Sequence, residues 1–399
     1  MNAQILVLNS GSSSLKFQLI EMPGERVVCE GMAERIGTEE GRLKMRQGQE
    51  TLEEDLGSVT HKGALERIAE LLRDPAPGGI RSGEDLAAVG HRVVHGGDRF
   101  SSTTEINEEV KEQIRDLSRL APLHNPPNLE GILLAESLFP GALQVAVFDT
   151  AFHQTIPMKA RKYAIPNALF RDHGVQVYGF HGTSHKYVYE QVALRMGRAA
   201  RIVSLHLGNG CSATAIQDGK SIDHSLGFTP SNGLIMGTRS GDIDHGIIFY
   251  LVETLGYSLG EVNDLLTRES GMAGLTGYTD FRDIQQGAER GEENCVLAME
   301  MAAYRIRKYI GAYAAAMNGL DGLIFTAGIG EHSAALRKAV CQEMDFFGIR
   351  LDPDKNKHPG GGVQQVHAAD SRVQIWVVPT DEELEIARQA YQIYQKSGH

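Results

Sequence analysis

The sequence predicts a mixed α/β protein whose fold is internally duplicated. Short apolar runs typical of buried strands alternate with longer amphipathic segments typical of helices along the 399 residues. Two strand–turn–strand segments with similar glycine- and serine-rich turns lie about two hundred residues apart. This pattern indicates two related halves, and at this length each half is large enough to form its own hydrophobic core.

The first of these segments stands at the N-terminus. The apolar run Ile5–Leu8 predicts a buried strand, and the polar run Asn9–Ser14 predicts a tight turn into a second strand that pairs back on the first. Backbone N–H groups, the hydroxyls of Ser12 and Ser14 and the ammonium of Lys16 can together form an anion cradle, most simply for phosphate. The alternative is an ordinary polar hairpin turn, which needs only one or two such residues.

The second segment lies near the middle of the chain, and a third glycine-rich turn follows later. Residues 202–207 predict a strand that leads through the turn Gly208–Ser212 into a second strand at 213–216. The apolar strand 322–325 leads into the turn Thr326–Glu331. Glycines let a ligand approach the backbone closely, so these turns indicate a nucleotide site. None of the three turns is a Walker A or a Gly-x-Gly-x-x-Gly sequence.

The remaining predicted elements continue the alternation of strands and helices. In the first half they are exposed hairpins at 21–58, an amphipathic helix at 105–120 capped by Thr103 or Thr104, a rigid turn at 125–128, a helix at 129–138 and a strand at 145–148 that ends at Asp149. In the second half they are a long helix at 295–317 stopped by Gly319, a strand at 373–378 and a final amphipathic helix at 382–395.

Composition excludes several classes of function. The net charge of −12 argues against nucleic-acid binding, which needs a basic surface. The four cysteines are scattered without a Cys-x-x-Cys pair, which favours unpaired thiols in a reducing compartment. No basic-then-apolar leader opens the sequence, and no apolar run reaches the ~18 residues of a membrane span. We therefore expect a cytoplasmic protein that binds neither nucleic acid nor membrane.

Several longer motifs resemble signature segments of the acetate kinases. They are Asn9–Lys16, Gly179–His185, His206–Gly210, Met236–Asp242, Asp280–Arg282 and Gly328–Glu331, and the likeness runs in the family's order from residue 5 to about residue 388. The resemblance implies the ribonuclease H-like fold of actin, sugar kinases and heat-shock ATPases, with the active site in the cleft between two duplicated domains. It implies an N-terminal domain at 1–150, joined by the C-terminal helix 384–399, a nucleotide-binding domain at 151–383, and a homodimer.

The reaction implied by the resemblance is reversible in-line transfer of a phosphoryl group from ATP to acetate, giving acetyl phosphate and ADP. A carboxylate is already anionic at neutral pH, so no general base is required, but positive charge must bring two anions together. The resemblance assigns catalytic roles to Arg92, Asp149, His181 and Arg239. Mg²⁺, for which Mn²⁺ can substitute, completes the site. The ordinary alternatives are a surface ion pair for each arginine and a structural role for the histidine.

The resemblance also assigns the residues that bind substrate, nucleotide and metal. Arg92, Val94, Leu123, Phe180 and Pro230 would form the acetate pocket, and Val94 would leave room for a methyl group. The residues that would contact the nucleotide are Ser12, Ser14, Lys16, His206, Leu207, Gly208, Asn209, Gly210, Asp280, Phe281, Arg282, Gly328, Ile329, Gly330, Glu331 and His332. Asn9 and Glu382 would ligate the metal, although an acidic residue at a helix start also stabilises the helix dipole.

Three positions depart from the family's pattern, and two other functions compete with the main one. Ser10 stands where alanine is common, and Asp381 and His332 stand where asparagine is common. Of these, His332 bears on the nucleotide contacts. The competing functions are a propionate or butyrate kinase of the same family, and a non-catalytic ATP-binding module of the same fold. The second would not need Arg92, Arg239 and His181 together with a small apolar pocket.

Overall fold

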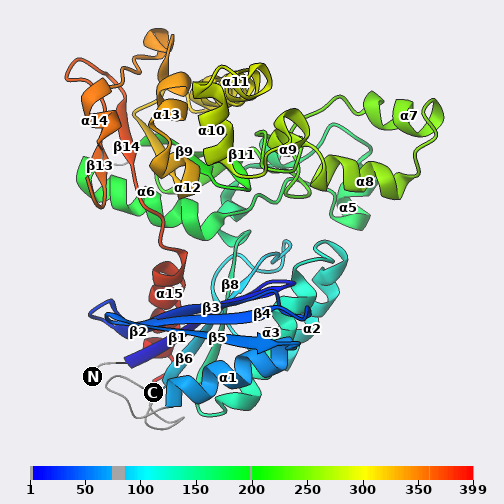
Figure 1. Ribbon diagram of the computed structural model, residues 1–399, viewed down its shortest axis with the longest axis vertical. Helices are drawn as coiled ribbons and strands as arrows, with labels where there is room; N and C mark the ends of the chain where they lie inside the picture. The colour runs from blue at the N-terminus through cyan, green and yellow to red at the C-terminus, as the bar shows by residue number, and fades with distance from the viewer. Residues whose placement is uncertain (1–2, 74–85, 198–199, 359, 399) are drawn as a thin grey trace. The chain divides into compact units, whose positions relative to one another are not determined.

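The computed structural model describes residues 3–73, 86–197, 200–358 and 360–398 (Figure 1). It comprises two compact units, each of which is described by itself. Unit 1 is Met1–Ala151 together with Asp381–His399, and unit 2 is Phe152–Thr380.

Unit 1 is built on a mixed sheet in the order β5-β4-β3-β2-β1-β6-β8-β7. The strands are β1 (Ala3–Ser10), β2 (Ser14–Met22), β3 (Arg26–Glu34), β4 (Gly41–Gln47), β5 (Glu50–Gly57), β6 (Leu86–Val93), β7 (Thr104–Glu105) and β8 (Leu143–Phe148). β1 to β5 form an antiparallel meander, whereas β1, β6 and β8 run parallel. The parallel strands are apolar on both sides because helices cover both faces of the sheet.

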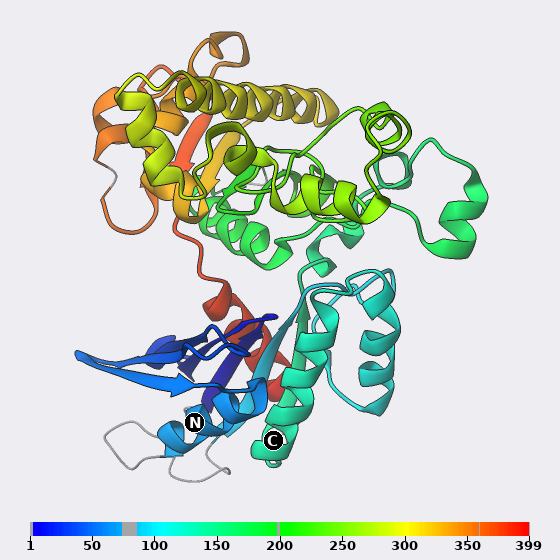
Figure 2. The same cartoon turned by 45° about the vertical axis from the view of Figure 1, so that its right-hand side comes forward.

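The helices of unit 1 divide between the two faces of this sheet (Figure 2). They are α1 (His61–Arg73), α2 (Glu108–Asp116) with the short η2 (Leu117–Arg119), α3 (Asn125–Leu138) and α15 (Glu382–Lys396). α1 and α3 pack on the face that carries Leu6 and Leu8. α15 packs on the opposite face, against Ile5 and Val7. The C-terminal helix is therefore part of the core of unit 1.

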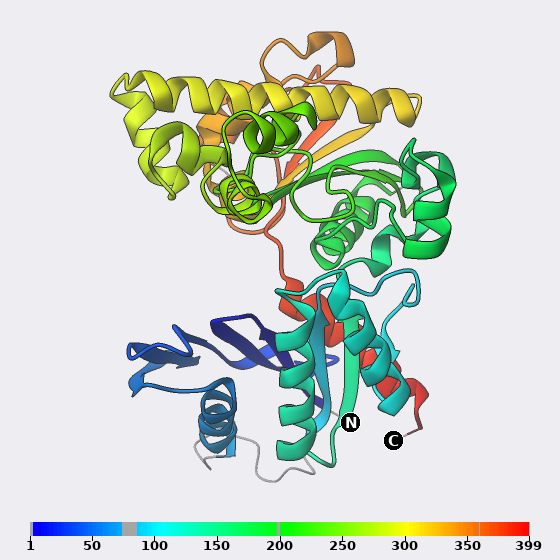
Figure 3. The ribbon, with the colours of Figure 1, turned by 90° about the vertical axis from the view of Figure 1, so that its right-hand side faces the viewer.

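Unit 2 is built on a second mixed sheet in the order β11-β10-β9-β12-β14-β13. Its strands are β9 (Arg201–Leu207), β10 (Cys211–Gln217), β11 (Lys220–His224), β12 (Gly322–Thr326), β13 (Gln364–Gln365) and β14 (Gln374–Val377). β9, β10 and β11 are antiparallel, and β9, β12 and β14 are parallel. Two long helices, α6 (Gly182–Met196) and α11 (Glu293–Ala316), cover opposite faces of this sheet (Figure 3).

Shorter helices complete unit 2. In chain order they are η3 (Ala151–Thr155), α4 (Met158–Arg161), α5 (Asn167–His173), α7 (Gly246–Glu253), α8 (Leu259–Arg268), α9 (Gly271–Thr276), α10 (Phe281–Glu289), α12 (Ala327–His332), α13 (Ala334–Cys341), η4 (Asp345–Phe347) and α14 (Pro353–Lys357). They include the segments that follow the two glycine-rich turns of this unit, and these segments form the candidate site described below.

The predicted duplication is confirmed by the connectivity of the two sheets. β3-β2-β1-β6-β8 in unit 1 and β11-β10-β9-β12-β14 in unit 2 share one order and one pattern of parallel and antiparallel pairs. Each sheet also ends in a two-residue antiparallel strand, β7 or β13. The two glycine-rich turns of the predicted repeat, β1–β2 and β9–β10, occupy equivalent places.

Several predicted boundaries were wrong, and local hydrogen bonds explain why. β1 continues through Ser10 and β2 begins at Ser14, so the N-terminal turn is only Gly11–Ser13. The cap of α2 is Asn107, whose side chain accepts the N–H of Val110, and neither Thr103 nor Thr104 caps it. The helix predicted from residue 129 begins at Asn125, because prolines at the first helical positions lack only N–H groups that would be unpaired there.

Three further predictions differ from the structure, all of them in unit 2. The segment predicted as a turn at 326–331 is the short helix α12, with Thr326 in the N-cap position. The turn between β9 and β10 contains only residues 208–210, since β10 begins at Cys211. The long helix α11 ends at Ala316, three residues before Gly319, and Asn318 adopts the left-handed conformation there. The last residue of the predicted C-terminal helix, 399, lies outside the described residues.

Removal of the Ile386 side chain should destabilise unit 1. Ile386 of α15 is fully buried, and its Cγ2 would lie 2.7 Å from a Cβ built on Gly90 of β6, so helix and strand are in direct contact. We expect Ile386→Ala to lower the free energy of unfolding by about 2–5 kcal/mol, measured by urea denaturation. The control Gln395→Ala, at an exposed position of the same helix, should change it by less than about 0.5 kcal/mol. Equal values for the two variants would contradict this packing.

Candidate active site

In unit 1 an arginine and an aspartate meet at the carboxyl ends of two parallel strands. Arg92 lies on β6, and Asp149 directly follows β8, which pairs with β6. The Nε of Arg92 lies 3.2 and 3.1 Å from the two carboxylate oxygens of Asp149, and its Nη2 lies 2.5 Å from Oδ2. Asp149 is 1% exposed, whereas the Arg92 side chain is 21% exposed. The buried carboxylate therefore fixes the orientation of a guanidinium that still reaches the surface.

Two further oxygen-bearing side chains lie around the same guanidinium. Nη1 of Arg92 donates to Oδ1 of Asn9 at 3.3 Å, and its Nε lies 3.7 Å from Oε2 of Glu382. Burial lowers the pKa of Arg92, but the carboxylates of Asp149 and Glu382 outweigh it and hold that pKa above its usual value. Burial raises the pKa of Glu382 to about 7, and the Arg92 charge opposes this shift. The structure thus brings together Arg92, Asp149, Asn9 and Glu382.

The N-terminal hairpin, whose first strand contains Asn9, carries the predicted phosphate-binding hydroxyls. The N–H of Gly11 donates to the carbonyl of Ser14 at 2.8 Å, which closes the turn and leaves Ser12 exposed and Ser14 half-buried. Lys16 forms an ion pair with Glu383 at 2.7 Å. This partner was not predicted from the sequence, since nothing in the motif distinguishes Glu383 from the adjacent Glu382.

The two predicted acetate-pocket residues of unit 1 have different surroundings. Val94 is half-buried, and its N–H donates to Oδ1 of Asn128 at 3.0 Å. Nδ2 of Asn128 donates to the carbonyl of Ser10 at 2.7 Å, so this asparagine links the ends of β1 and β6. Leu123 is 63% exposed. The structure therefore holds Val94 firmly and leaves Leu123 on the surface of unit 1.

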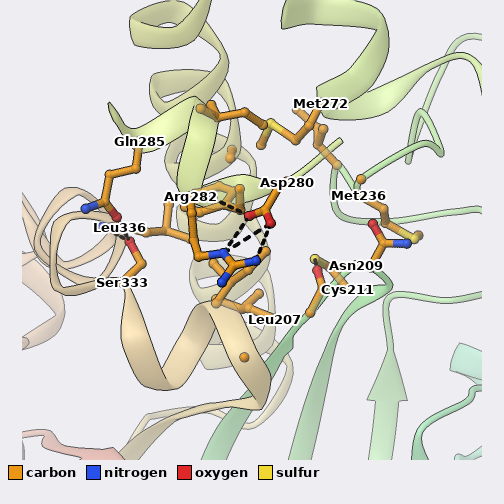
Figure 4. Close-up of a pocket in the computed structure, with 18 of the residues that line it drawn as sticks. Leu207, Asn209, Cys211, Met236, Met272, Asp280, Arg282, Gln285, Ser333 and Leu336 are labelled. Atoms are coloured by element: carbon orange, nitrogen blue, oxygen red, sulfur yellow. Dashed lines mark hydrogen bonds and ion pairs between the residues drawn. The ribbon is translucent and has the colours of Figure 1, made fainter. Parts of the chain in front are cut away.

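Unit 2 contains a cavity of about 910 Å³ between its glycine-rich turns and the helices α10, α11 and α13 (Figure 4). Nine of the residues predicted to contact a nucleotide line it: Leu207, Gly208, Asn209, Asp280, Phe281, Arg282, Gly328, Ile329 and His332. His206, Gly210, Gly330 and Glu331 are adjacent in sequence but do not line it. The volume is within the range of small-molecule sites. The structure thus gathers three separate sequence motifs around one cavity.

The sequence did not identify several residues that line this cavity. They include Cys211, Met236, Thr238, Met272, Gln285 and Ser333. Met236 and Thr238 lie in a motif recognised from the sequence, whereas Met272, Gln285 and Ser333 carry no motif of their own. Oγ of Ser333 donates to Oε1 of Gln285 at 2.8 Å, which links α13 to α10 across the cavity wall. Burial raises the pKa of the Cys211 thiol to about 12, which favours its protonated form near neutral pH.

An aspartate–arginine pair lies at the edge of the cavity. Asp280 caps α10 by accepting the N–H of Arg282 at 2.8 Å, and its carboxylate also pairs with the Arg282 guanidinium, with Nη2 at 2.5 Å from Oδ2 (Figure 4). These hydrogen bonds from Arg282 lower the pKa of Asp280 to about 2. The exposed Arg282 side chain is therefore held in one orientation by a fully ionised partner.

The buried Arg337 supports the cavity wall from behind. Its Nη1 donates to the carbonyls of Gly330 and Glu331, both at 2.8 Å, and its Nε and Nη2 donate to Asn356, also at 2.8 Å. Burial without a carboxylate partner lowers the pKa of Arg337 to about 10. These bonds satisfy the carbonyls at the end of α12, whose first residues line the cavity. No sequence motif identifies this arginine.

His181 and Arg239 converge on the turn between β9 and β10. A Cβ built on Gly210 would lie 3.6 Å from Nε2 and Cε1 of His181 and 3.8 Å from Nη1 of Arg239. That nitrogen donates to the carbonyl of Pro230 at 2.8 Å. Burial lowers the pKa of Arg239. Within the described part of the chain, Arg239 forms no ion pair with a carboxylate.

The His181 ring is oriented by a chain of buried hydroxyls and imidazoles. Its Nδ1 lies 2.9 Å from Oγ of Ser212, which in turn lies 2.8 Å from Nε2 of His185. Nδ1 of His185 lies 2.8 Å from Oγ of Ser204. The His181 ring also stacks on His206, with ring centroids 4.3 Å apart. Burial lowers the pKa of His185 well below 6.5, so this histidine is neutral.

Phe180, predicted to line the acetate pocket, is 3% exposed within unit 2. Its carbonyl accepts hydrogen bonds from two histidines, His153 at 3.0 Å and His224 at 2.6 Å. Neither histidine was singled out from the sequence. Motif spacing could not have identified them, because neither histidine belongs to a recognised motif and both are distant in sequence from Phe180.

The described residues contain neither a cluster of typical metal-binding side chains nor a helix that could span a membrane. Across residues 3–73, 86–197, 200–358 and 360–398, no group of three or more histidine, cysteine, aspartate or glutamate side chains is placed to hold a metal ion. In the same residues, every helix is too short or too polar to cross a membrane.

Comparison with known proteins places the whole chain in one family. The model of the acetokinase family matches residues 4–388. The acetate kinase of Flavobacterium johnsoniae is 55% identical over 392 residues, which cover 98% of this chain and 100% of that protein. The acetate kinase of Thermotoga maritima is 50% identical, with coverage of 99% and 100%.

Solved structures agree with this assignment. The crystal structure of Porphyromonas gingivalis acetate kinase matches with a TM-score of 0.93 at 44% identity, covering 98% of this chain and 99% of that one. A propionate kinase from Francisella tularensis matches with the same TM-score at 41% identity and the same coverage. The predicted fold class, a duplicated α/β fold of the actin-like ATPase type, is therefore confirmed. On sequence, fold and the motifs gathered at its cavity, the chain belongs to the acetokinase family.

Proposed function

We propose that this chain catalyses the reversible, magnesium-dependent transfer of the γ-phosphoryl group of ATP to acetate, giving acetyl phosphate and ADP by direct in-line displacement. Membership of the acetokinase family and 55% identity to an acetate kinase support this function. The observation that carries it is the end of the unit 2 cavity. There the turn at Gly208 and Asn209 leads to Gly210, beside which the guanidinium of Arg239 and the imidazole of His181 converge.

Arg239 supplies positive charge to the transferring phosphoryl group. A half-buried guanidinium without a carboxylate partner is costly in the free protein, and an anion that binds beside it removes that cost. In the described residues its recorded hydrogen bonds go only to the Pro230 carbonyl and the Met236 sulfur. These contacts orient the guanidinium without neutralising it. Its charge is therefore retained for the oxygens of the phosphoryl group in the transition state.

His181 acts as a hydrogen-bond donor to the same phosphoryl group. The chain of Ser204, His185 and Ser212 allows two hydrogen-bond directions, and in one of them the Ser212 hydroxyl donates to Nδ1 of His181. The proton of the neutral ring is then on Nε2, the nitrogen that faces the Gly210 turn. We assign this direction because it gives the ring a donor where phosphoryl oxygens would lie.

Arg92 binds the anionic substrate, and Asp149 orients Arg92. The buried carboxylate makes close contacts to two nitrogens of the guanidinium, so Asp149 is occupied as an ion-pair partner. It has no proton to accept, since acetate reacts as the carboxylate. Val94, Leu123, Phe180 and Pro230 contribute to recognition of the methyl group. The mechanism therefore uses positioned cations and donors in place of a general base.

The residues of unit 1 fit a magnesium ion. Oδ1 of Asn9 and the carboxylate of Glu382 are hard oxygen donors on either side of Arg92. Mg²⁺ keeps several waters and binds phosphate oxygens, so two protein oxygens suffice, and Mn²⁺ accepts the same donors. When bound, the ion would neutralise charge on the β- and γ-phosphates of the nucleotide. Asn9 and Glu382 would hold it, and their own positions are set by Arg92.

The cavity of unit 2 binds the nucleotide through the residues that line it. The side chains of Met272 and Phe281 offer apolar surface to the base. Asp280 and Arg282 form an ion pair at the rim of the cavity. The amides of Gly208, Gly328 and their neighbours approach the phosphates and ribose. Ser12, Ser14 and Lys16 serve the terminal phosphate, and His206, Gly210, Gly330 and Glu331 hold these turns in place.

Propionate is the second candidate substrate. A propionate kinase is 41% identical to this chain and has the same fold with a TM-score of 0.93. Val94 leaves room for a methyl group, and one additional methylene changes discrimination by only ~1–3 kcal/mol. We therefore propose acetate as the preferred acid and propionate as a poorer substrate.

We also propose that the protein works as a homodimer in a reducing compartment, the cytoplasm. All four cysteines are buried free thiols, which is typical of that compartment. Around α7 and the start of α8 an apolar surface is exposed, formed by Ile247, Phe249, Tyr250, Leu255 and Leu259. α7 has no buried residue although its sequence is almost entirely apolar. Such a surface requires a partner, and a second copy of the chain is the partner that the family resemblance implies.

Replacing Arg239 tests the proposed mechanism. We expect Arg239→Ala to lower kcat for acetate by about 10²–10³-fold, because it removes the charge that stabilises the transition state. The KM for ATP should stay within about threefold, since Arg239 does not line the nucleotide cavity. Both are measured by coupled detection of ADP. The control Arg350→Ala removes an exposed arginine that pairs with Asp345 and should leave kcat unchanged. Loss of ATP binding with preserved kcat would contradict the assignment.

Substitution of Val94 tests the acetate pocket. Val94→Ala enlarges the space beside the methyl group, so kcat/KM for propionate relative to acetate should rise by roughly tenfold. The matched control is Val363→Ala, at a half-buried valine of unit 2 away from the cavity and from the phosphoryl site. The ratio should not change there. An unchanged ratio in Val94→Ala would remove this residue from the acetate pocket.

A charged substitution on α7 tests the proposed dimer surface. Phe249→Glu introduces a charge at an exposed apolar position, so the unpaired carboxylate should convert dimer to monomer without unfolding the chain. Light scattering after size-exclusion chromatography gives the mass, and circular dichroism monitors the fold. Leu194→Glu, at an exposed leucine of α6, is the control that should stay dimeric. A dimer that survives the Phe249 substitution would place the interface elsewhere.

A further inference from the structure

The turn that carries His181 is held in a strained backbone conformation. Gly179 has φ of +76° and His181 has φ of +57°, and both values lie in the left-handed region. For a residue with a side chain this region costs about 1–2 kcal/mol. Such a conformation persists only where the surrounding structure imposes it, and it is found most often at functional sites. Phe180 lies between these two residues, so contacts to its backbone can hold the turn in this conformation.

Two imidazoles converge on the carbonyl oxygen of Phe180. Nε2 of His153, from η3, lies 3.0 Å from this oxygen, and Nε2 of His224, from the end of β11, lies 2.6 Å from it. Both histidines are at least 95% buried, and their ring centroids are 4.1 Å apart. A carbonyl oxygen can only accept, so each contact is a hydrogen bond where Nε2 carries the proton of its ring.

The partner of the other ring nitrogen decides where each proton lies. Nδ1 of His153 lies 2.8 Å from Oγ of Ser221, a hydroxyl that can donate to it, so the proton of His153 is on Nε2. Nδ1 of His224 lies 2.9 Å from the carbonyl of Ala213, a second acceptor, which already accepts the N–H of Ser225. Burial lowers the pKa of His224 to about 4 and that of His153 well below 6.5, so each ring is neutral near pH 7. A neutral His224 donates to only one of its two carbonyl partners, and we take Phe180 as that partner because Ala213 keeps the Ser225 N–H as its donor.

The packing around the turn shows that both rings also contact its backbone. A Cβ built on Gly179 would lie 2.4 Å from Cδ2 of His224 and 2.7 Å from Cγ of His153. No side chain fits there while the rings keep these positions. A third buried histidine, His185, lies with its ring centroid 5.9 Å from that of His153 and belongs to the hydroxyl chain that orients His181. The two rings thus fill the space behind the turn.

We infer that His153 and His224 are positioning residues of the phosphoryl-transfer site: they clamp the Phe180 carbonyl and thereby fix the backbone on which His181 stands. This inference rests on the proposed function, in which His181 donates to the phosphoryl group. Neither clamp residue lines the nucleotide cavity. If the clamp is lost, the Phe180–His181 peptide can rotate out of its left-handed geometry, and Nε2 of His181 then leaves the Gly210 turn. A displacement of ~1 Å at a catalytic group can cost roughly 10²-fold in rate.

Two amide substitutions at His224 separate the two carbonyl contacts of its ring. The amide nitrogen of His224→Gln can occupy the place of Nε2 and donate to Phe180. The amide nitrogen of His224→Asn can occupy the place of Nδ1 and donate to Ala213. We expect Gln to keep kcat within about threefold of wild type, and Asn and Ala to lower it by about 10–100-fold. The KM for ATP should be unchanged in all three, since the cavity lining is intact.

Several outcomes are decisive for this test. Equal kcat values for folded Gln and Asn variants would overturn the clamp. If neither variant folds, the same pair at His153 provides the test, because His153→Gln keeps a donor toward Phe180 and His153→Asn does not. His367→Ala, which removes a half-buried histidine with backbone contacts elsewhere in unit 2, should alter thermal stability but not kcat. Failure of the proposed function is distinguishable, because the wild-type protein would then form no acetyl phosphate. Wild-type kcat in His181→Ala would instead remove the catalytic role of His181.

Discussion

The chemistry proposed for this chain depends on keeping positive charge uncompensated in an acidic protein. The chain has a net charge of −12, and many of its arginines form ion pairs with nearby carboxylates. Arg239 differs, because its hydrogen bonds go to a backbone carbonyl and a thioether. Arg92 does form an ion pair, with the buried carboxylate of Asp149. This carboxylate fixes the orientation of the Arg92 guanidinium, which still reaches the surface. Arg239 thus carries a charge that no carboxylate of the described residues neutralises, whereas Arg92 is oriented by Asp149.

Around these charges the fold supplies rigidity through small residues and backbone contacts. Gly210 leaves space between His181 and Arg239, and Gly179 leaves space for two imidazole rings. Arg337 satisfies the carbonyls at the end of α12, so the glycine-rich segment that lines the cavity is held from behind. Asn128 does the same for the ends of β1 and β6 in unit 1. In the last two cases a buried polar side chain bonds main-chain atoms and so holds a segment of the site in place.

The sequence predicted most of what depends on local pattern and little of what depends on contacts between distant segments. Apolar runs and glycine-rich turns predicted the hairpin that begins with strand Ile5–Leu8, the hairpin at 202–216 and the duplicated sheets. The periodicity of a strand is local, so it can be read from the sequence. The cap of α2 was wrong because Thr103, Thr104 and Asn107 are all good capping residues, and only the fold selects Asn107. His153, His224 and Arg337 could not be found, because a single polar residue in an apolar segment has no periodic signature.

Formation of acyl hydroxamate from Mg-ATP and hydroxylamine would show whether the chain transfers a phosphoryl group to acetate. Acetate, propionate, butyrate and a sample without acid would be compared at equal concentration. Hydroxylamine traps the acyl phosphate itself, so the assay identifies the product and not only the consumption of ATP. We expect most product with acetate, less with propionate and none without acid. Absence of acyl phosphate with every acid, in protein that binds ATP, would contradict the proposed function and favour a non-catalytic ATP-binding module.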